Sequence, residues 1–252
     1  MCSSDLPEPD GRNSPHRATR DRLPTRDVAD MHLAELLESS GCPLCRTRLR
    51  EARRHLGSVL YESVNDPAFR DRLLAARGFC RAHSQQLLAA NRAGAGGSLG
   101  AAILFGSVIR KRLAELKKVA DGRGRPMDRD LELARRPASC PTCEQVESAQ
   151  ASAVSRLLDR TSDEHWRVAL AAAELCLDDL LLLAAAADRR SGRWSEVFGA
   201  QIGRVEGIAA RLEGFAYNSS YDRLHLMTDA ERRASDEAAV LLGGTVSEAQ
   251  AR

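Results

Sequence analysis

Aromatic residues are scarce in this sequence, and neither sign of charge dominates it. Phe, Trp and Tyr make up 4% of the 252 residues, and 37 lysines and arginines face 35 aspartates and glutamates. The net charge of +2 argues against the strong basic field of a dedicated polyanion-binding protein. Hydrophobic residues still reach 43%, which excludes a wholly disordered chain. The composition therefore predicts a core of alanine, leucine and valine on closely packed helices.

The sequence also lacks a long apolar run without charges. The most apolar window, Val168 to Ala187, contains Glu174, Asp178 and Asp179 near its middle. Each central charge would cost roughly 2.5–3.5 kcal/mol in a bilayer, so the window predicts a buried helix and no membrane span. The N-terminal residues lack the apolar segment of a secretory signal and predict a disordered tail over residues 1–30. We therefore expect a cytoplasmic protein.

Six of the seven cysteines fall into two triplets of the same shape. In each triplet, a Cys-Pro-x-Cys pair is followed by a third cysteine after a stretch long enough for a helical hairpin. The triplets are offset by about a hundred residues, which indicates a tandem duplication. Without a secretory signal, paired CxxC motifs are more typical of metal sites than of structural disulfides. The seventh cysteine, Cys2, lies in the predicted tail and is most simply a spare thiol.

The first triplet is expected to close around a metal through a helical hairpin. Apolar residues repeat at helical spacing after Cys45, and Asp66 and Pro67 then predict the N-cap and first residue of a second helix. Gly78 ends that second helix. Two antiparallel helices return the chain to its starting end, so the CxxC pair meets the CxxH pair there. The four expected ligands are Cys42, Cys45, Cys80 and His83.

Zinc is the metal predicted for this first site, because three thiolates and one imidazole match a closed tetrahedral Cys₃His shell. Iron–sulfur chemistry fits a histidine ligand and widely separated pairs less well. A thioredoxin-like redox motif would follow a strand, and no strand pattern precedes either CxxC pair. The alternative without metal is a set of ordinary buried cysteines beside a surface histidine.

The second triplet is expected to close in the same way, around a capping box at Thr161 to Glu164. Its last ligand is an aspartate where the first triplet has a histidine, so a bound zinc would carry one more negative charge and require positive charge nearby. His165 is a substitute ligand only if its helix turns it toward the cysteines. Three interpretations stay open: a weaker zinc site, a decayed site, and a reactive or catalytic centre with an exchangeable ligand. The four expected ligands are Cys140, Cys143, Cys176 and Asp179.

Several stretches resemble a bacterial family of unknown function that contains duplicated CPxC…GFCxxH units. The stretches are GCPLCR, YESVNDP, RGFCRAH and the second CPTC, and the resemblance covers about Met31 to Gly244. It implies a helical, zinc-bearing protein and gives no activity. The chain departs from the family pattern at Asp179. It also departs at Tyr217 to Arg223, which is at best a remnant of a Lys-x-Asp-Tyr-Arg-like stretch.

The predicted fold is all-α, with two pseudo-repeated zinc-clamped helical hairpins and additional C-terminal helices. Periodic apolar residues predict helices over Leu99 to Ala120 and Asp229 to Leu242, with an apolar stripe starting at Trp194 between them. The expected organisation is a tail over 1–30, a first unit over 31–120, a linker over 121–137, a second unit over 138–190 and C-terminal helices over 191–252.

The function favoured by the sequence is a zinc-binding scaffold or adaptor that acts through protein partners, since no catalytic motif is recognisable. A thiol-based redox or metal sensor at the second site is the main alternative, and a zinc-dependent enzyme at the Cys₃Asp site is another. Whether the protein is an enzyme stays open, with a non-catalytic role favoured. Basic clusters follow the first CxxC pair and recur at Arg110 to Lys118. Nucleic acid binding is possible but not favoured, because acidic residues interleave and aromatics are few.

Overall fold

The computed structural model describes residues 23–93, 99–121, 139–187 and 192–245. These residues form helices and contain no strand, which confirms the all-α prediction. The predicted linker from 122 onward, Cys2 and the predicted tail as far as 22 lie outside the described residues. The helices are α1 (Val28–Leu37), α2 (Pro43–Ser58), the π-helical turn η1 (Val59–Ser63), α3 (Pro67–Ala75), α4 (Arg81–Ala93), α5 (Leu99–Asp121), α7 (Pro141–Arg160), α8 (Glu164–Ala172), α9 (Leu177–Ala186), α10 (Gly192–Asn218), the 3₁₀ turn η2 (Leu224–Leu226) and α11 (Asp229–Gly243).

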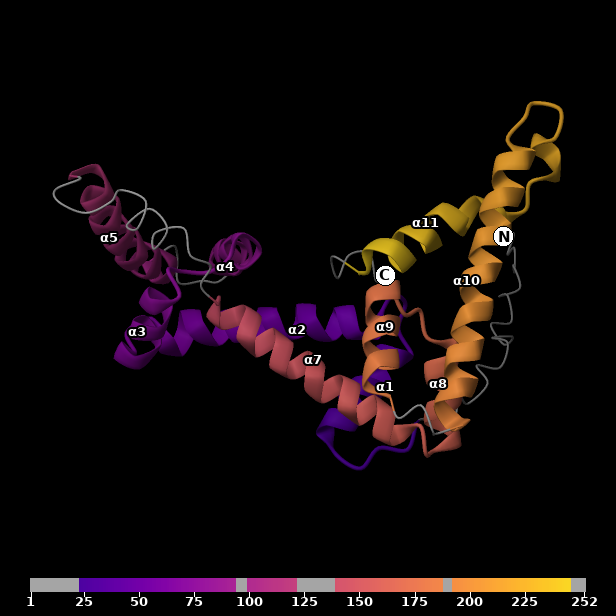
Figure 1. The fold of residues 1–252 in the computed structure, drawn as a ribbon, viewed down its shortest axis with the longest axis horizontal. Coiled ribbons are helices and arrows are strands. Elements are labelled where there is room, and N and C mark those ends of the chain that lie inside the picture. The colour runs from indigo at the N-terminus through magenta and orange to yellow at the C-terminus, as the bar shows by residue number, and fades with distance from the viewer. Residues whose placement is uncertain (1–22, 94–98, 122–138, 188–191, 246–252) are drawn as a thin grey trace, which may run out of the picture.

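Helices α2 and α7 form an antiparallel pair through the middle of the molecule (Figure 1). Nδ1 of His55 on α2 lies 3.1 Å from the Thr142 hydroxyl oxygen at the start of α7. Glu51 lies one turn before His55 on α2, and Gln145 lies one turn after Thr142 on α7. The Gln145 amide donates a hydrogen bond to the Glu51 carboxylate at 3.1 Å. Residue numbers therefore fall along one helix as they rise along the other. As a result, the start of each helix lies beside the later part of its partner.

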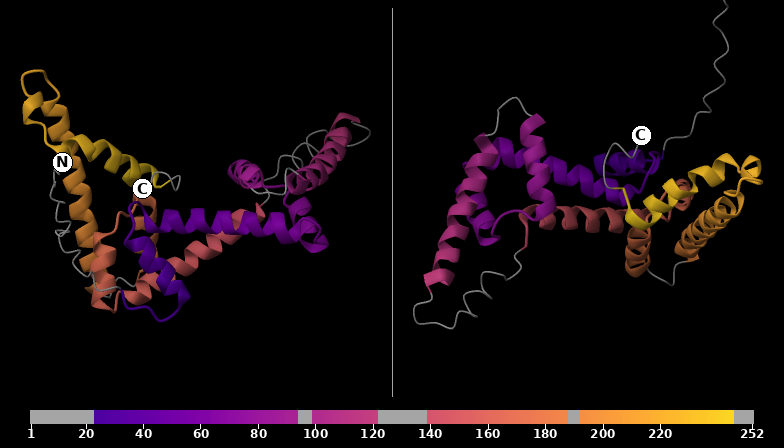
Figure 2. Two further views of the ribbon diagram at one scale, coloured as in Figure 1. Left: turned by 180° about the vertical axis from the view of Figure 1, so that it is seen from behind. Right: turned by 90° about the horizontal axis from the view of Figure 1, so that it is seen from above.

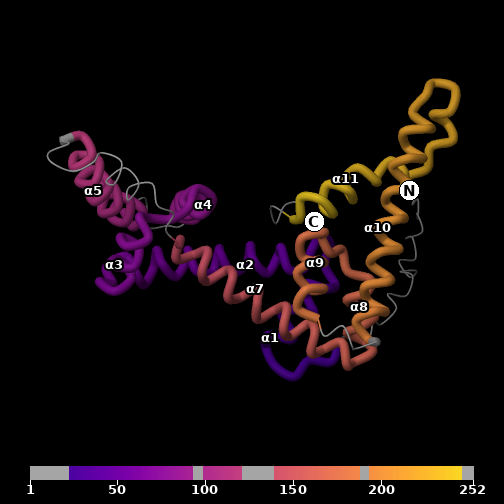
Figure 3. Tube along the Cα trace, in the orientation of Figure 1, coloured from indigo at the N-terminus to yellow at the C-terminus, as the bar shows by residue number. Residues whose placement is uncertain are grey.

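The α2/α7 pair joins two groups of helices, one at each end (Figures 1 and 2). Helices α3, α4 and α5 lie at the end where α7 begins, and α8 to α11 lie at the end where α2 begins. The Cα tube follows the same path, with α1 against the middle pair (Figure 3). The first group packs around Leu56, Phe69, Leu73, Leu87 and Leu104, and the second around Leu157, Trp166, Leu170, Leu183 and Val197.

Local sequence signals set several helix ends as predicted. The Asp66 carboxylate accepts the backbone N–H of Ala68 at 3.0 Å, and Pro67 is the first residue of α3. Gly78 has a φ of 102°, and its N–H donates to the Leu73 carbonyl at 2.9 Å just beyond α3. These ends fix where the chain turns toward Cys80.

Two local predictions differ from the structure at the start of the chain and before α8. The chain is already folded within the predicted tail, because Leu23 is buried and α1 begins at Val28. The N-cap of α8 is Asp163, whose carboxylate accepts the backbone N–H groups of His165 and Trp166. The predicted capping box over Thr161 to Glu164 is therefore wrong, because the carboxylate of Asp163 reaches the free N–H groups directly.

The continuous buried helix predicted over Val168 to Ala187 is also wrong. Helix α8 ends at Ala172, α9 begins at Leu177, and the residues between them are extended or bent. The buried amide of Gln201 on α10 donates to the carbonyls of Leu170, Ala171 and Ala173 at 2.9–3.1 Å. These bonds satisfy carbonyls that a helix end leaves free. Among the described residues, no helix has the length and apolar character needed to cross a bilayer.

Candidate metal centres

The eight predicted ligands gather into two compact clusters, but not in the predicted combinations. Within each cluster, the candidate ligand atoms all lie within 4.8 Å of one another, so each cluster could hold a metal ion. We call them the His cluster and the Asp cluster. The His cluster consists of Cys80, His83, Cys140 and Cys143, and the Asp cluster consists of Cys42, Cys45, Cys176 and Asp179.

The prediction that each CxxC pair meets the third cysteine of its own triplet is therefore wrong. Helix lengths explain the exchange. Helix α2 and η1 together extend roughly 31 Å, whereas the returning helix α3 has 9 residues and extends roughly 14 Å. The chain therefore reaches Cys80 near the far end of α2, beside the start of α7. The same mismatch between α7 and α8 leaves Cys176 near the start of α2.

Each cluster forms where two helix N-termini meet. The His cluster joins the starts of α4 and α7, and the Asp cluster joins the starts of α2 and α9. In all four motifs the carbonyl of the first cysteine accepts the first helical hydrogen bond, at 2.9–3.1 Å. The fourth residue of each motif then lies on the first helical turn, on the same side as the cysteine. Helix N-termini favour anionic groups, and they also favour thiolates.

The His cluster is compact and partly accessible to solvent. The Sγ atoms of Cys80 and Cys143 lie 3.7 Å apart. His83 Nδ1 lies 3.2 Å from the Cys80 sulfur, 3.4 Å from that of Cys143 and 3.6 Å from that of Cys140. Cys80 and Cys143 are partly exposed, whereas Cys140 is buried. Burial and the neighbouring charge of Cys140 raise the pKa of Cys143 to about 12, so a metal ion must displace its proton to bind.

The Asp cluster is fully buried. Its four residues are each less than 6% exposed, and Asp179 is 1% exposed. The thiols of Cys42, Cys45 and Cys176 approach the same oxygen, Oδ2 of Asp179, at 3.1, 3.3 and 3.2 Å. The sulfurs of Cys45 and Cys176 lie 3.7 Å apart, and none of the three cysteines forms a disulfide. Hydrogen bonds with Cys176 and Cys42, together with the charge of Arg48, lower the pKa of Cys45 to about 2.

Arg48 provides the positive charge that was expected beside Asp179 to offset the negative charge of the site. Its guanidinium donates to both carboxylate oxygens of Asp179, at 2.8 and 3.2 Å, and to the sulfur of Cys45 at 2.9 Å. The amide of Gln150 on α7 also donates to Asp179, at 2.9 Å. Burial raises the pKa of the Asp179 carboxyl, and Arg48 opposes that rise. Sequence reasoning missed this role, although Arg48 lies one turn after Cys45 on the same helix face.

A scan against protein-family models matches residues 25–203 to a family described as "Family of unknown function (DUF6062)". The chain belongs to this DUF6062 family. The matched residues contain all eight cluster residues. They also cover most of the region, about Met31 to Gly244, over which the sequence resembles the family with duplicated CPxC motifs. The searches of curated proteins and of solved structures found no match. The family assignment therefore gives no activity for the two clusters.

A segment beyond the DUF6062 match closes over the Asp cluster. The backbone N–H of Cys42 donates to the Thr245 hydroxyl at 2.9 Å. Gly244, at the end of α11, has a φ of 68°, and a Cβ added there would lie 2.6 Å from the Cys45 sulfur. Glycine therefore allows both the backbone conformation and the close approach.

The other residues considered in the sequence lie outside both clusters. His165 is exposed on α8 and is not among the cluster ligands. Four arginines that follow the first CxxC pair have partners inside the molecule. These contacts are Arg46 with the Ser40 carbonyl, Arg48 with Asp179, Arg50 with Glu35 and Arg54 with Glu51.

Proposed function

We propose that this DUF6062 protein is a zinc-stabilised helical scaffold that acts through contacts with other proteins. The observation that carries the zinc assignment is the spacing of the ligand atoms. A tetrahedral zinc with bonds to sulfur of about 2.3 Å holds its sulfurs about 3.8 Å apart. The Cys80–Cys143 and Cys45–Cys176 sulfur pairs are both 3.7 Å apart. Thiolates also favour zinc over the hard cations magnesium and calcium.

The positions of the clusters support a stabilising role for the metal. One ion would join α4 to the start of α7, and the other would join α9 to the start of α2. Each ion would therefore fasten an end group of helices to the middle pair. A core with few aromatics gains from such links, since the binding energy of a structural zinc is also folding energy.

The surroundings of the Asp cluster support a structural role over a catalytic one. Catalytic zinc needs a fourth position that water or substrate can reach. Asp179 is buried and also accepts hydrogen bonds from Arg48 and Gln150. The cavity beside α8 and the groove between α1, α2 and α7 are lined by other residues.

Exposed apolar residues on α5 support the protein-contact part of the proposal. Ile109, Leu113 and Leu116 are 64%, 48% and 57% exposed and lie at helical spacing on one face. The face of α5 that packs against the molecule includes Leu104 and Val108. Four of the arginines after the first CxxC pair have partners within the chain, as described above, and this pairing weighs against a nucleic acid partner.

Zinc analysis combined with metal removal tests the proposal. Protein purified without added metal should contain two zinc ions per chain by elemental analysis. A strong chelator should then cause a large loss of helical circular dichroism, because apparent binding free energies of structural zinc are about 10–16 kcal/mol per ion. Adding zinc back should restore the signal. A chain that contains no zinc and keeps its melting temperature in chelator would contradict the proposal.

A redox sensor is the second candidate, and the structure favours the His cluster for it. Cys80 and Cys143 are partly exposed, so peroxide can reach them more readily than the buried sulfurs of the Asp cluster. Two thiolates, one hydrogen peroxide and two protons would give one disulfide and two waters, releasing the metal. Mild peroxide should then release one zinc per chain and link Cys80 to Cys143, as read by a zinc-sensitive dye and peptide mapping. If the first zinc released were accompanied by a disulfide between Cys45 and Cys176, this candidate would be contradicted.

A further inference from the structure

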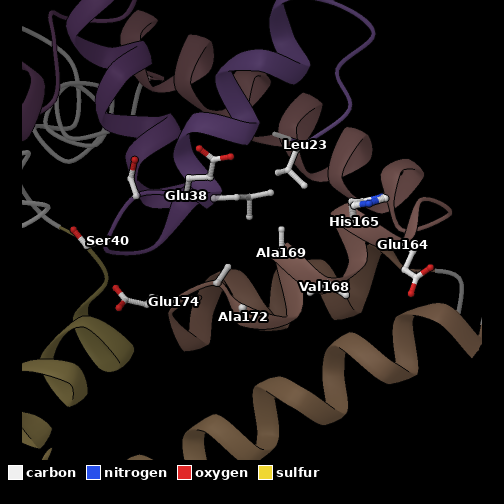
Figure 4. Close-up of a pocket in the computed structure, with 12 residues that line it drawn as sticks. Leu23, Glu38, Ser40, Glu164, His165, Val168, Ala169, Ala172 and Glu174 are labelled. Carbon is white, nitrogen blue, oxygen red and sulfur yellow. The ribbon is translucent and has the colours of Figure 1, made fainter. Parts of the chain in front are cut away.

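A cavity of about 760 Å³ lies between α8 and the end of α1, and none of the eight cluster residues lines it (Figure 4). This volume is within the range of about 300–1,000 Å³ that is typical of small-molecule sites. One wall is a single face of α8, from Glu164 to Ala172, continued by Ala173 and Glu174 just beyond its end. The facing wall includes Leu37 and Glu38 at the end of α1. The cavity is therefore a slot along one helix.

The middle of the slot is apolar and uncovered. Val168, Ala169 and Ala172 follow one another along α8, and Leu23 and Leu37 also contribute apolar surface. Val168 is 63% exposed. The small alanine side chains leave room for a chain of methylene groups against the helix. Covering this surface would be favourable because apolar area would leave water.

The charges around the slot are negative and lie toward its ends. Glu164 begins α8 and Glu174 follows its end, so the two residues are roughly 15 Å apart along the helix direction. Glu38 stands on the facing wall, nearer Glu174 than Glu164 in the view of Figure 4. All three glutamates are exposed. No lysine or arginine is among the described residues that line the slot.

Glu174 already has partners within the fold, because its carboxylate accepts the backbone N–H of Gly41 and the charge of Arg204 acts on it. Arg167 on α8 donates to Glu196 at 2.7 Å. Arg204 on α10 donates to the Leu175 carbonyl. The carboxylates of Glu38 and Glu164 are therefore available to a cation from outside the described fold.

We propose that this slot binds a linear aliphatic diamine or polyamine. One ammonium group would lie near Glu164 and another near Glu38, toward the Glu174 end of the slot, with the methylene chain over Val168, Ala169 and Ala172. The chain length follows from the separation of the charged ends, and the preference for cations follows from the glutamates. Because the glutamates are exposed, binding weakens as salt rises. The proposal is independent of the metal, since no cluster ligand lines the slot.

Calorimetric titration of the full-length, metal-loaded protein at low salt tests the proposal. Three probes separate charge from length: 1,10-diaminodecane, the short 1,4-diaminobutane, and the uncharged 1,10-decanediol. We expect the long diamine to bind at least tenfold more tightly than either of the others. Equal binding of the diol would show an apolar groove without cation preference, and equal binding of the short diamine would show unspecific charge attraction. Either result, or no binding of the long diamine, would overturn the proposal.

Variants place the binding in the slot. Glu38→Gln combined with Glu164→Gln should weaken binding of the long diamine about tenfold, whereas Glu213→Gln, an exposed position on α10, should leave it unchanged. Ala169→Phe should fill the slot and abolish binding without loss of zinc. Equal effects of the Glu213 and Glu38/Glu164 changes would overturn the assignment to this slot.

The chain's own N-terminal residues are the competing occupant, because residues 1–22 lead directly to Leu23 and include Arg17, Arg20 and Arg22. A full-length variant with these three arginines changed to serine should bind the long diamine with unchanged affinity. A gain of tenfold or more would assign the slot to that segment and overturn the proposal.

Discussion

Replacing Cys42 and Cys176 together should lower the zinc content from two ions per chain to one, whereas replacing Cys42 and Cys80 together should remove both. The reason is that Cys42 and Cys176 belong to one cluster, while Cys42 and Cys80 belong to two. A tetrahedral site that has lost one or two of its thiolates binds zinc far more weakly. Elemental analysis of serine variants after brief exposure to a mild chelator measures the difference.

Cobalt substitution makes the same test independent of total metal content. Cobalt in a tetrahedral thiolate site absorbs visible light, so each intact cluster gives its own signal. The Cys42→Ser/Cys176→Ser variant should keep the absorption of a Cys₃His site, and Cys2→Ser should keep both signals. If Cys42→Ser/Cys80→Ser retained one full equivalent, the ligands would pair within each hairpin and the exchanged arrangement would be wrong.

Arg48→Ala should weaken zinc binding at the Asp cluster about tenfold to a hundredfold, the usual cost of removing a group that orients a metal ligand. Arg48 donates to both oxygens of Asp179 and to the Cys45 sulfur. Without Arg48, the negative charge of the thiolates and of Asp179 loses the positive charge that lies against it. Competition against a chelator of known affinity should show one weakened equivalent and one unchanged. Arg50→Ala is the matched control, because Arg50 lies on the same helix and pairs with exposed Glu35.

The pH dependence of the same variant gives a second readout with a defined sign. Protons compete with the metal for thiolates and carboxylates, so zinc leaves as the pH falls. The positive charge of Arg48 lowers the pKa values of Cys45 and Asp179. Without Arg48 these groups take up protons at higher pH, so the Asp cluster of the variant should release zinc at a higher pH than in the wild type. Release of both equivalents at unchanged pH would contradict the role assigned to Arg48.

Local signals in the sequence were sufficient for helix type and several helix ends. Asp66, Pro67 and Gly78 act through neighbouring backbone groups, so their effect can be read from a few residues. The break between α8 and α9 could not be read in this way, because the amide that satisfies the end of α8 comes from Gln201, some thirty residues later. The apolar window around it therefore resembled one helix. The predicted duplication stays a prediction.

The residues that form the two clusters were predictable from the sequence, but their grouping depended on helix lengths. The helical run after Cys45 is about twice as long as the run that starts at Pro67, and this difference favours an arrangement in which Cys80 stops short of Cys42. Arg48 could also have been identified, since a cation one turn after Cys45 lies on the same face of the helix as that cysteine. The approach of Gly244 and Thr245 could not, because it depends on the path of α10 and α11.

The exchanged ligand pairs also set an order in which the protein can be completed during synthesis. After the first four motif residues have left the ribosome, Cys42/Cys45 and Cys80/His83 are both present, yet each is half of a different site. The His cluster becomes complete only once Cys143 has emerged, and the Asp cluster only once Asp179 has emerged. A growing chain therefore presents unfilled thiol pairs for much of its synthesis. In the proposed zinc-bound form, metal loading would coincide with the docking of the two halves, and a truncated first half would lack a complete cluster.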